Sequence, residues 1–265
     1  MNLEHFAKTA QTAACKASEL LIDLFGHLNG YTTKSSPYDL VTEADQKAEQ
    51  VILSVIQKHH PSHRILSEEQ PPETIDWDDF LWVIDPLDGT TNYAHKYPFF
   101  CVSIALVYKK TPLVGVVFAP LLHLQYAAVK GNGATCNGAK IRVSSVQRIR
   151  ESLFATGFAY RRESNTAQIY RDFAHLTQIS HGVRRDGSAA LDLAFVASGK
   201  LEGFWERALK PWDIAAGALI VEEAGGVVST VDGSPLDLER GDVLAANPEI
   251  HPQLLGELTA LRSSE

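Results

Sequence analysis

The chain has 265 residues, of which 45% are hydrophobic and 21% are charged. This composition is typical of a folded globular protein and excludes a chain that stays disordered. The formal net charge of -8 argues against a protein that binds nucleic acid through the phosphates, because such proteins usually carry a dense basic face.

The cysteines and the apolar runs indicate where the chain works. Cys15, Cys101 and Cys136 have neither the spacing of a zinc site nor that of a disulfide framework, so we expect a reducing, cytoplasmic setting. The first residues lack the pattern of a signal peptide. No apolar run approaches the ~20 residues that cross a bilayer. We therefore expect no membrane segment.

The first elements along the chain are predicted to be two helices. Apolar residues recur three or four apart over residues 3–25, which predicts a long helix with one apolar face and with Gly30 just past its end. Thr42 followed by Asp45 resembles a capping pair. The second helix is expected to run from there to about His60.

Strands dominate the middle of the chain, and strands alternate with helices after it. We expect strands at 64–66, 80–84, 102–108, 113–118 and 124–129, and a hairpin turn at 109–112. Later helices are expected at 167–179, 188–198, 213–224 and 252–261, separated by strands at 203–206, 226–230 and 243–246. A boundary near 143–152 predicts an N-terminal lobe of residues 1–146 and a C-terminal lobe of residues 147–265, packed as one compact unit.

The segment with the clearest chemistry is WVIDPLDGTTNY, residues 82–93. An apolar strand leads into Asp85 and Asp88, with a proline between them and Gly89 permitting a tight turn after them. This arrangement can aim both carboxylates and the Leu87 carbonyl at one point, and magnesium prefers such oxygen ligands. A surface turn is the alternative, because Asp, Pro and Gly are common turn residues.

Three other features can complete an anion-handling metal site. The backbone N–H groups of Gly89 and Thr90 can approach a phosphate closely. Glu68 follows a short strand, although a solvated acidic pair with its neighbour is the alternative. Asp213 opens a helical run, where an N-cap is the alternative. An acidic protein acting on a phosphate would need bound metal ions to supply positive charge.

Taken together, these segments resemble the inositol monophosphatase family. The resemblance rests on residues 85–93, on the acidic pair at 68–69, and on residues 212–217 followed by 223–226. Residues 34–45 and 187–192 add to it, so that it covers nearly the whole chain. It implies a mixed α/β (α+β) fold, the layered αβαβα sandwich of the inositol monophosphatase and fructose-1,6-bisphosphatase type. It also implies the hydrolysis of inositol 1-phosphate or a similar small polyol or sugar phosphate.

The resemblance further implies two or three magnesium ions. One would be held by Glu68, Asp85 and the Leu87 carbonyl, and a second by Asp85, Asp88 and Asp213, with a weaker third ion near Glu68. Paired metals offset the charge of a phosphate monoester and lower the pKa of a bound water.

The remaining roles concern the water and the substrate. By resemblance, Asp45 and Thr90 orient the attacking water, and Glu68 also takes part in catalysis, without a covalent intermediate. The substrate would be bound by two groups of residues. They are Gly89, Thr90 and Asp213 around the phosphate, and Gly187, Ser188, Ala189 and Glu206 around the hydroxyl groups. For Glu206 a surface charge is the alternative, and for Ser188 the N-cap of its helix.

Other readings stay open. Ser67, Asp186 and residues 207–210 differ from the residues usual in the family, which leaves the substrate less defined than the chemistry. The same reaction on histidinol phosphate, fructose 1,6-bisphosphate or a nucleotide phosphate is one alternative. A regulatory binding protein without turnover is another, although no metal carboxylate is missing. Family resemblance also implies a homodimer and inhibition by lithium and calcium.

Overall fold

The computed structural model describes residues 3–27, 32–33, 40–71, 74–158 and 166–261. The helices are α1 (Leu3–Leu24), α2 (Glu43–His59), α3 (Thr90–Ala94), α4 (Thr166–Ile179), α5 (Ala189–Ala197), α6 (Pro211–Glu223) and α7 (His251–Ala260), with the 3-10 turns η1 (Pro120–Leu122) and η2 (Ile149–Glu151). The strands are β1 (Thr32–Thr33), β2 (Leu40–Val41), β3 (Arg64–Ser67), β4 (Leu81–Asp88), β5 (Cys101–Tyr108), β6 (Thr111–Ala119), β7 (Leu124–Val129), β8 (Gly133–Cys136), β9 (Ala139–Lys140), β10 (Leu153–Thr156), β11 (Gly182–Arg184), β12 (Gly203–Glu206), β13 (Val227–Ser229) and β14 (Val243–Ala246).

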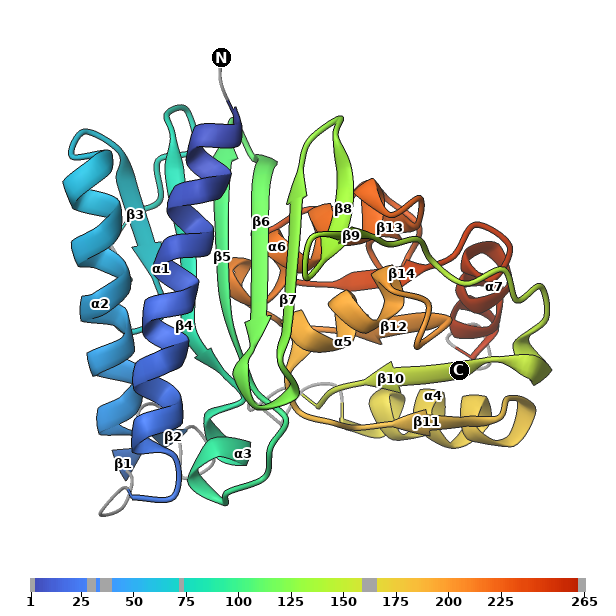
Figure 1. Cartoon of the computed structure of the whole chain (residues 1–265). Helices are drawn as coiled ribbons and strands as arrows, with labels where there is room; N and C mark the ends of the chain where they lie inside the picture. The colour runs from blue at the N-terminus through green and yellow to red at the C-terminus, as the bar shows by residue number, and fades with distance from the viewer. Residues whose placement is uncertain (1–2, 28–31, 34–39, 72–73, 159–165, 262–265) are drawn as a thin grey trace.

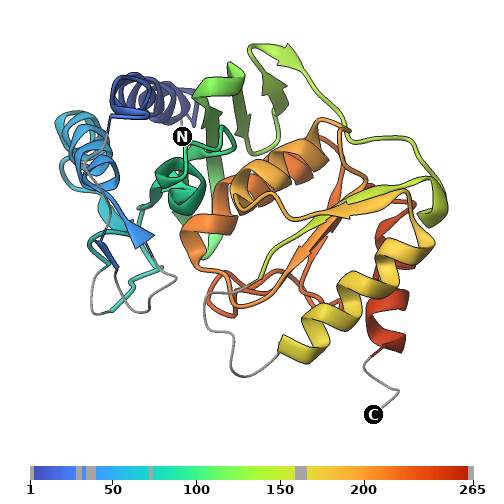
Figure 2. The ribbon, with the colours of Figure 1, turned by 90° about the horizontal axis from the view of Figure 1, so that it is seen from below.

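The helices and sheets form alternating layers. Strands β3 to β9 make a seven-stranded sheet in chain order, and a five-stranded sheet has the order β11-β10-β12-β14-β13. Helices α1 and α2 cover one face of the larger sheet, α5 and α6 fill the space between the sheets, and α4 and α7 lie on the far side (Figures 1 and 2). The predicted mixed α/β fold with αβαβα layering is confirmed.

The first helix packs through small side chains. Ala10, Ala13 and Ala17 of α1 are fully buried, and they recur three or four apart, which is the period of one helix face. Alanines at these positions let α1 lie close to α2 and to the sheet. The helix ends at Leu24. Gly30, which was predicted to follow its end, lies outside the described residues.

The second helix has the predicted capping pair. The Thr42 side chain accepts a hydrogen bond from Ala44 N, and the Thr42 backbone N–H donates to Asp45 Oδ2 at 2.7 Å. These bonds satisfy two of the N–H groups that every helix start leaves open. The helix predicted to run from Thr42 to about His60 is confirmed.

Strand β4 is longer than expected and carries the acidic motif itself. We predicted a strand ending at residue 84, but β4 continues through Asp88 and is buried along its whole length. Its register against β5 shifts between Asp85, which pairs with Ser103, and Asp88, which pairs with Cys101. Such an irregularity accommodates the proline that lies between the two aspartates, because proline has no N–H for the ladder. The surface-turn alternative for this segment is therefore wrong.

Some short elements escaped prediction. Strands β8 and β9 are partly or fully exposed, and β10 and β11 have four and three residues, so none shows a readable alternation of apolar and polar residues. Helix α6 begins at Pro211, two residues earlier than expected, because proline suits the first helical position. No helix within the described ranges combines the length and the apolar character needed to cross a membrane.

Candidate active site

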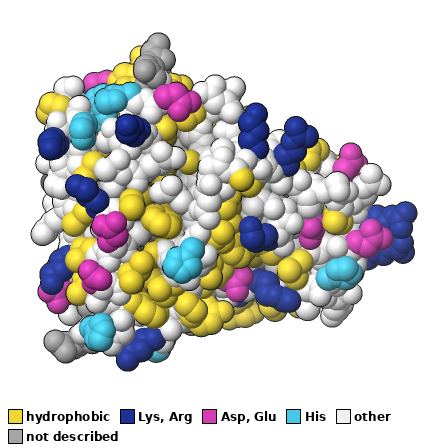
Figure 3. Space-filling model, viewed as in Figure 1, with side chains coloured by type: hydrophobic (Ala, Val, Ile, Leu, Met, Phe, Trp, Pro, Cys, Tyr) yellow, Lys and Arg dark blue, Asp and Glu magenta, His cyan; other side chains and the backbone are white. Residues whose placement is uncertain are grey.

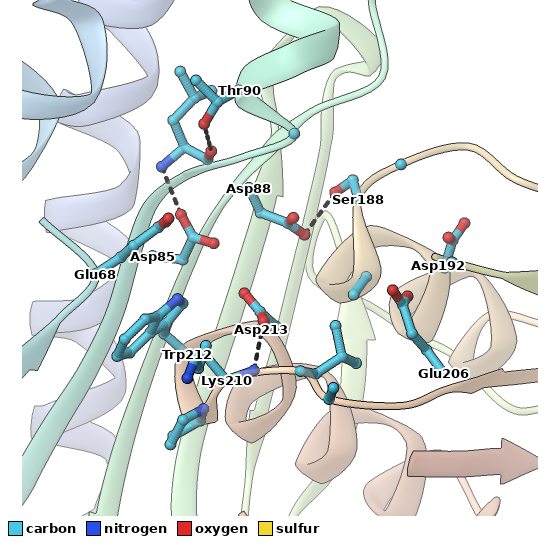
Figure 4. Close-up of a pocket in the computed structure, with 18 of the residues that line it drawn as sticks. Glu68, Asp85, Asp88, Thr90, Ser188, Asp192, Glu206, Lys210, Trp212 and Asp213 are labelled. Carbon is cyan, nitrogen blue, oxygen red and sulfur yellow. Dashed lines mark hydrogen bonds between the residues drawn. The ribbon is translucent and has the colours of Figure 1, made fainter. Parts of the chain in front are cut away.

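The end of β4 delivers two carboxylates into one pocket of about 870 Å³. Asp85 is 2% exposed and Asp88 is 8% exposed, and both line the pocket together with Leu87 and Glu68 (Figure 4). The Asp85 carboxylate turns back onto the chain, because its Oδ1 accepts a hydrogen bond from Leu87 N at 2.9 Å. The bulged backbone between the aspartates thus holds the first carboxylate in place.

Thr90 joins this motif to the start of α2. Its hydroxyl lies 2.8 Å from Asp45 Oδ1 and 3.1 Å from the Leu87 carbonyl oxygen. Because a hydroxyl has one proton, the shorter contact to the carboxylate is the stronger bond. Asp45 is fully buried, and it is absent from the residues that line the pocket. It therefore reaches the site through Thr90.

Asp88 connects the larger sheet to α5. Its Oδ2 accepts hydrogen bonds from Ser188 Oγ at 2.7 Å and from Ala190 N at 2.8 Å, and the Cys101 thiol lies 3.8 Å away. Ser188 is the residue before α5, as the N-cap alternative expected, but its side chain makes no capping bond there. The hydroxyl instead orients a carboxylate from a strand 100 residues earlier.

Asp213 comes from the opposite side of the pocket, in the first turn of α6 (Figure 4). Lys210, and not Asp213, is the N-cap residue, so the N-cap alternative is wrong. Asp213 is the third residue of the helix and accepts a hydrogen bond from Lys210 N at 2.7 Å through Oδ2. A carboxylate is favourable here, because the N-terminus of a helix carries partial positive charge.

The carboxylates raise one another's pKa. Burial first, and then the charges of Glu68, Asp88 and Asp213, raise the pKa of Asp85 well above its ordinary value. Burial likewise raises the pKa of Asp88 to about 6, against the opposing hydrogen bonds from Ser188 and Ala190. Burial, Asp88 and Glu68 raise the pKa of Asp213. The site therefore holds more negative charge than it can keep ionised without a cation.

This donor set fits divalent cations that prefer oxygen ligands. Carboxylates and a backbone carbonyl are such ligands, and bound cations would relieve the repulsion that raises these pKa values. Within the described ranges, no three His, Cys, Asp or Glu side chains are already grouped as a finished set of metal ligands. The carboxylates line a common pocket, and their side chains would have to move to close around an ion.

The other predicted substrate-binding residues line the same pocket. Gly187, Ser188, Ala189 and Glu206 all line it, as do Gly89 and Thr90 near the aspartates. Gly89 has a φ of 99°, and a Cβ there would lie 3.0 Å from the Phe99 carbonyl oxygen, so glycine is required at this turn. Burial raises the pKa of Glu206 to about 8, and Arg185 opposes the rise. The surface-charge alternative for Glu206 is wrong, because this side chain is only 9% exposed.

The pocket is also lined by residues that had no role in the prediction, among them Gly157, Arg185 and Asp192. Asp192 is 1% exposed, and its Oδ1 has no hydrogen-bond partner among the described residues. In the sequence it reads as an ordinary polar residue of a helix. Only the packing of α5 against β12 shows that it is buried beside Glu206 (Figure 4).

Comparisons with known proteins identify the family of the chain. The model of the inositol monophosphatase family matches residues 2–263. The inositol-1-monophosphatase of Synechocystis is 46% identical over 98% of this chain and 90% of its own length. The Nus factor SuhB of Pseudomonas aeruginosa is 41% identical over 93% of each chain. The structure of the inositol monophosphatase of Anabaena superimposes with a TM-score of 0.89 at 43% identity, covering 98% of this chain and 97% of that one.

The fold and the relatives named inositol monophosphatase are those of a phosphatase family. The chain belongs to the inositol monophosphatase family.

Proposed function

We propose that this chain is a magnesium-dependent phosphatase that hydrolyses inositol 1-phosphate or a similar small polyol or sugar phosphate. The observation that carries the proposal is the convergence of Glu68, Asp85, Asp88 and Asp213 on one pocket, from three separate parts of the chain. The name of the Synechocystis relative supports the substrate.

In this proposal Glu68, Asp85 and the Leu87 carbonyl hold one magnesium ion, and Asp85, Asp88 and Asp213 hold a second, with room for a third near Glu68. Bound magnesium would offset the charge of the phosphate and make a water more acidic. The pKa rises of the three aspartates support the assignment, because they mark the sites where a cation is most favourable.

The protein's own part is positioning. Asp45 draws the proton of the Thr90 hydroxyl toward itself, which leaves the lone pairs of Thr90 Oγ1 free to accept a hydrogen bond from the attacking water. Glu68 lines the same pocket and would help to hold that water. The water attacks phosphorus directly, so no covalent enzyme intermediate forms.

Substrate contacts divide along the pocket. The backbone N–H groups of Gly89 and Thr90 would bind the phosphate, with Asp213 beside it. Gly187, Ala189 and Glu206 would meet the alcohol part of the substrate. Ser188 would act mainly on Asp88, to which its hydroxyl is bonded.

The test is phosphate release from inositol 1-phosphate, fructose 1,6-bisphosphate, histidinol phosphate and adenosine 3',5'-bisphosphate, each with magnesium and with a chelator. We expect magnesium-dependent release, fastest from inositol 1-phosphate. A faster rate on another ester would replace the substrate and keep the chemistry. No release from any of them would refute the proposal.

A regulatory role without turnover is the second candidate, and the name of the Pseudomonas relative, Nus factor SuhB, is the observation that favours it. The formal net charge of -8 gives no support to nucleic-acid binding, and on the face in Figure 3 lysine and arginine side chains are scattered and form no single basic band. Stabilisation by magnesium without hydrolysis of any ester in the panel would favour this second candidate.

Assembly and setting extend the first proposal. We propose a homodimer in the cytoplasm, inhibited by lithium and calcium. An exposed apolar surface supports a partner subunit, because soluble monomers rarely gather such side chains. Hydrophobic side chains gather in the lower part of the molecule in Figure 3, over the end of α1 and the turn between β6 and β7, and Ile22 of α1 is 43% exposed.

A further inference from the structure

The Glu206 carboxylate lies at the far end of the pocket from Glu68 and Asp85 (Figure 4). Glu206 is 9% exposed and lines the pocket, and within the described part of the chain no hydrogen bond or ion pair reaches its carboxylate. Its neighbours are mostly acidic or apolar, and Arg185 is the nearby cation that offsets its charge. A buried carboxylate without hydrogen bonds is costly, so this group is prepared to accept them from a ligand.

Gly157 makes the room in which this carboxylate lies. A Cβ atom at Gly157 would stand 2.0 Å from Glu206 Oε2 and 2.2 Å from Cδ, far inside contact distance. Gly157 does not have a positive φ, so alanine is compatible with its backbone. Glycine is therefore needed at this position for the space and not for the conformation.

The pairing of two strands fixes this arrangement. Thr156, at the end of β10, pairs with Trp205 of β12, and its hydroxyl donates to the Trp205 carbonyl oxygen at 2.6 Å. The next residues along the chain are therefore Gly157, just past the end of β10, and Glu206, the last residue of β12. Phe158 follows, and the Arg185 guanidinium lies 5.8 Å from the centre of its ring. The side chain that offsets the charge of Glu206 thus lies close to the residue that follows Gly157.

We propose that Gly157 is a specificity-determining positioning residue, which seats the Glu206 carboxylate so that it accepts hydrogen bonds from a hydroxyl group on the alcohol part of the substrate. The inference rests on the proposed function and names a feature of its substrate, namely a hydrogen-bond donor away from the phosphate. An added methyl group at position 157 displaces the carboxylate into the pocket and leaves the metal-binding carboxylates untouched.

The test compares Gly157→Ala with the wild type on two esters that share a six-membered ring, inositol 1-phosphate and cyclohexyl phosphate. Only the first has hydroxyl groups. We expect kcat/KM for inositol 1-phosphate to fall about 10-fold or more, mainly through KM, as for the loss of a hydrogen bond that leaves a buried polar group unsatisfied. For cyclohexyl phosphate we expect a change of less than about twofold, because no bond is lost there.

A double-mutant cycle shows whether Gly157 acts through Glu206. Glu206→Ala should give a similar loss on inositol 1-phosphate, and adding Gly157→Ala to it should cost nothing more. Gly256→Ala is the matched control, because a Cβ there meets no atom within 4 Å. It should leave both rates unchanged.

The contrary outcomes are distinct. Equal losses on both esters, additive losses in the double variant, or a folding defect of Gly157→Ala that Glu206→Ala does not relieve would overturn the role of Gly157 and leave the proposed function standing. An unchanged Gly157→Ala would do the same. A wild type that releases no phosphate from inositol 1-phosphate with magnesium would overturn the proposed function, and with it this inference.

Discussion

Asp88 is the residue at which the parts of the site meet. It sits on β4, its Oδ2 accepts hydrogen bonds from Ser188 and Ala190 at the start of α5, and it shares the pocket with Asp213 of α6. Burial and a neighbouring carboxylate raise its pKa to about 6. The ionised form of the Asp88 carboxylate is therefore unfavourable unless a cation binds beside it.

Asp88→Asn should separate the metal role of this carboxylate from its structural role. The amide oxygen can still accept the bonds from α5, while one negative charge is lost. We expect magnesium-dependent phosphate release to fall on the order of 100-fold or more, without a lower unfolding midpoint in chelator, because repulsion in the metal-free site decreases. Release within a few-fold of the wild type would refute the metal assignment of Asp88.

Among single residues, the sequence alone indicated a shared site only for residues that are close together in the chain. Asp85, Leu87 and Asp88 lie within four residues of the chain, and their spacing suggested a shared site, with a surface turn as the alternative. The bond between Thr90 and Asp45 spans 45 positions, and only the family resemblance indicated it. The catalytic roles of these residues stay predictions. Gly157 and Asp192 were missed because their surroundings are made by residues from distant strands and helices.

At the scale of elements, the crossing of α5 and α6 holds the two halves of the site together. Gly217 of α6 faces Leu193 of α5, and a Cβ at Gly217 would lie 2.6 Å from the Leu193 Cβ atom. Both helices are nearly all buried, so neither can move away easily.

Gly217→Ala should therefore destabilise the protein by about 1–3 kcal/mol, as expected for overpacking a core. The free energy of unfolding in urea measures this. Gly256→Ala in α7 is the control, because a Cβ at that position meets no atom within 4 Å. Its free energy of unfolding should rise by up to about 1 kcal/mol from helix propensity. If Gly217→Ala were as stable as that control, the close packing of α5 on α6 would be refuted.

Elements with a strong period were predicted, and short ones were not. The apolar periods of α1 and α2 are visible in the sequence because each helix has one buried face. Helices α5 and α6 are buried on nearly all sides, so no apolar period in the sequence marks where they begin. The start of α6 is fixed by Pro211, which takes the first helical position. The four-residue strand β10 depends on its parallel partners β11 and β12, which come from later segments.

At the scale of the whole molecule, the five layers place the site where β4, α5 and α6 meet. The family resemblance gave this layering, since composition and periodicity alone indicated only a layered mixture. The division into lobes at residues 146 and 147 stays a prediction. A separate cluster of side chains lies where α1 and the end of α2 meet the larger sheet. In it, His60 contacts Thr9, His63 and Trp82.

His60 should make the fold sensitive to acid. Burial first, and then repulsion from His63, His5 and His59, lowers its pKa from 6.5 to about 4. Between pH 6.5 and pH 4, His60 is protonated in the unfolded chain but neutral in the folded chain. The free energy of unfolding therefore decreases as the pH falls from 6.5 to 4.

The measurement is the urea unfolding midpoint from pH 8 to pH 4. The midpoint of His60→Gln should fall less steeply than that of the wild type across that window. His95→Gln, which changes an exposed histidine, is the control and should follow the wild type. Equally steep curves for His60→Gln and the wild type would refute the role of His60.

The most direct test of the proposed magnesium site is calorimetric titration of magnesium into the wild type and into Asp213→Asn at neutral pH. Asp213 comes from a different part of the chain than Asp85 and Asp88, so it tests whether they form one site. We predict that the wild type binds two or more ions and that Asp213→Asn loses at least one of them. The proposed site would be contradicted by a wild type that binds no magnesium, or by a variant that binds as many magnesium ions as the wild type.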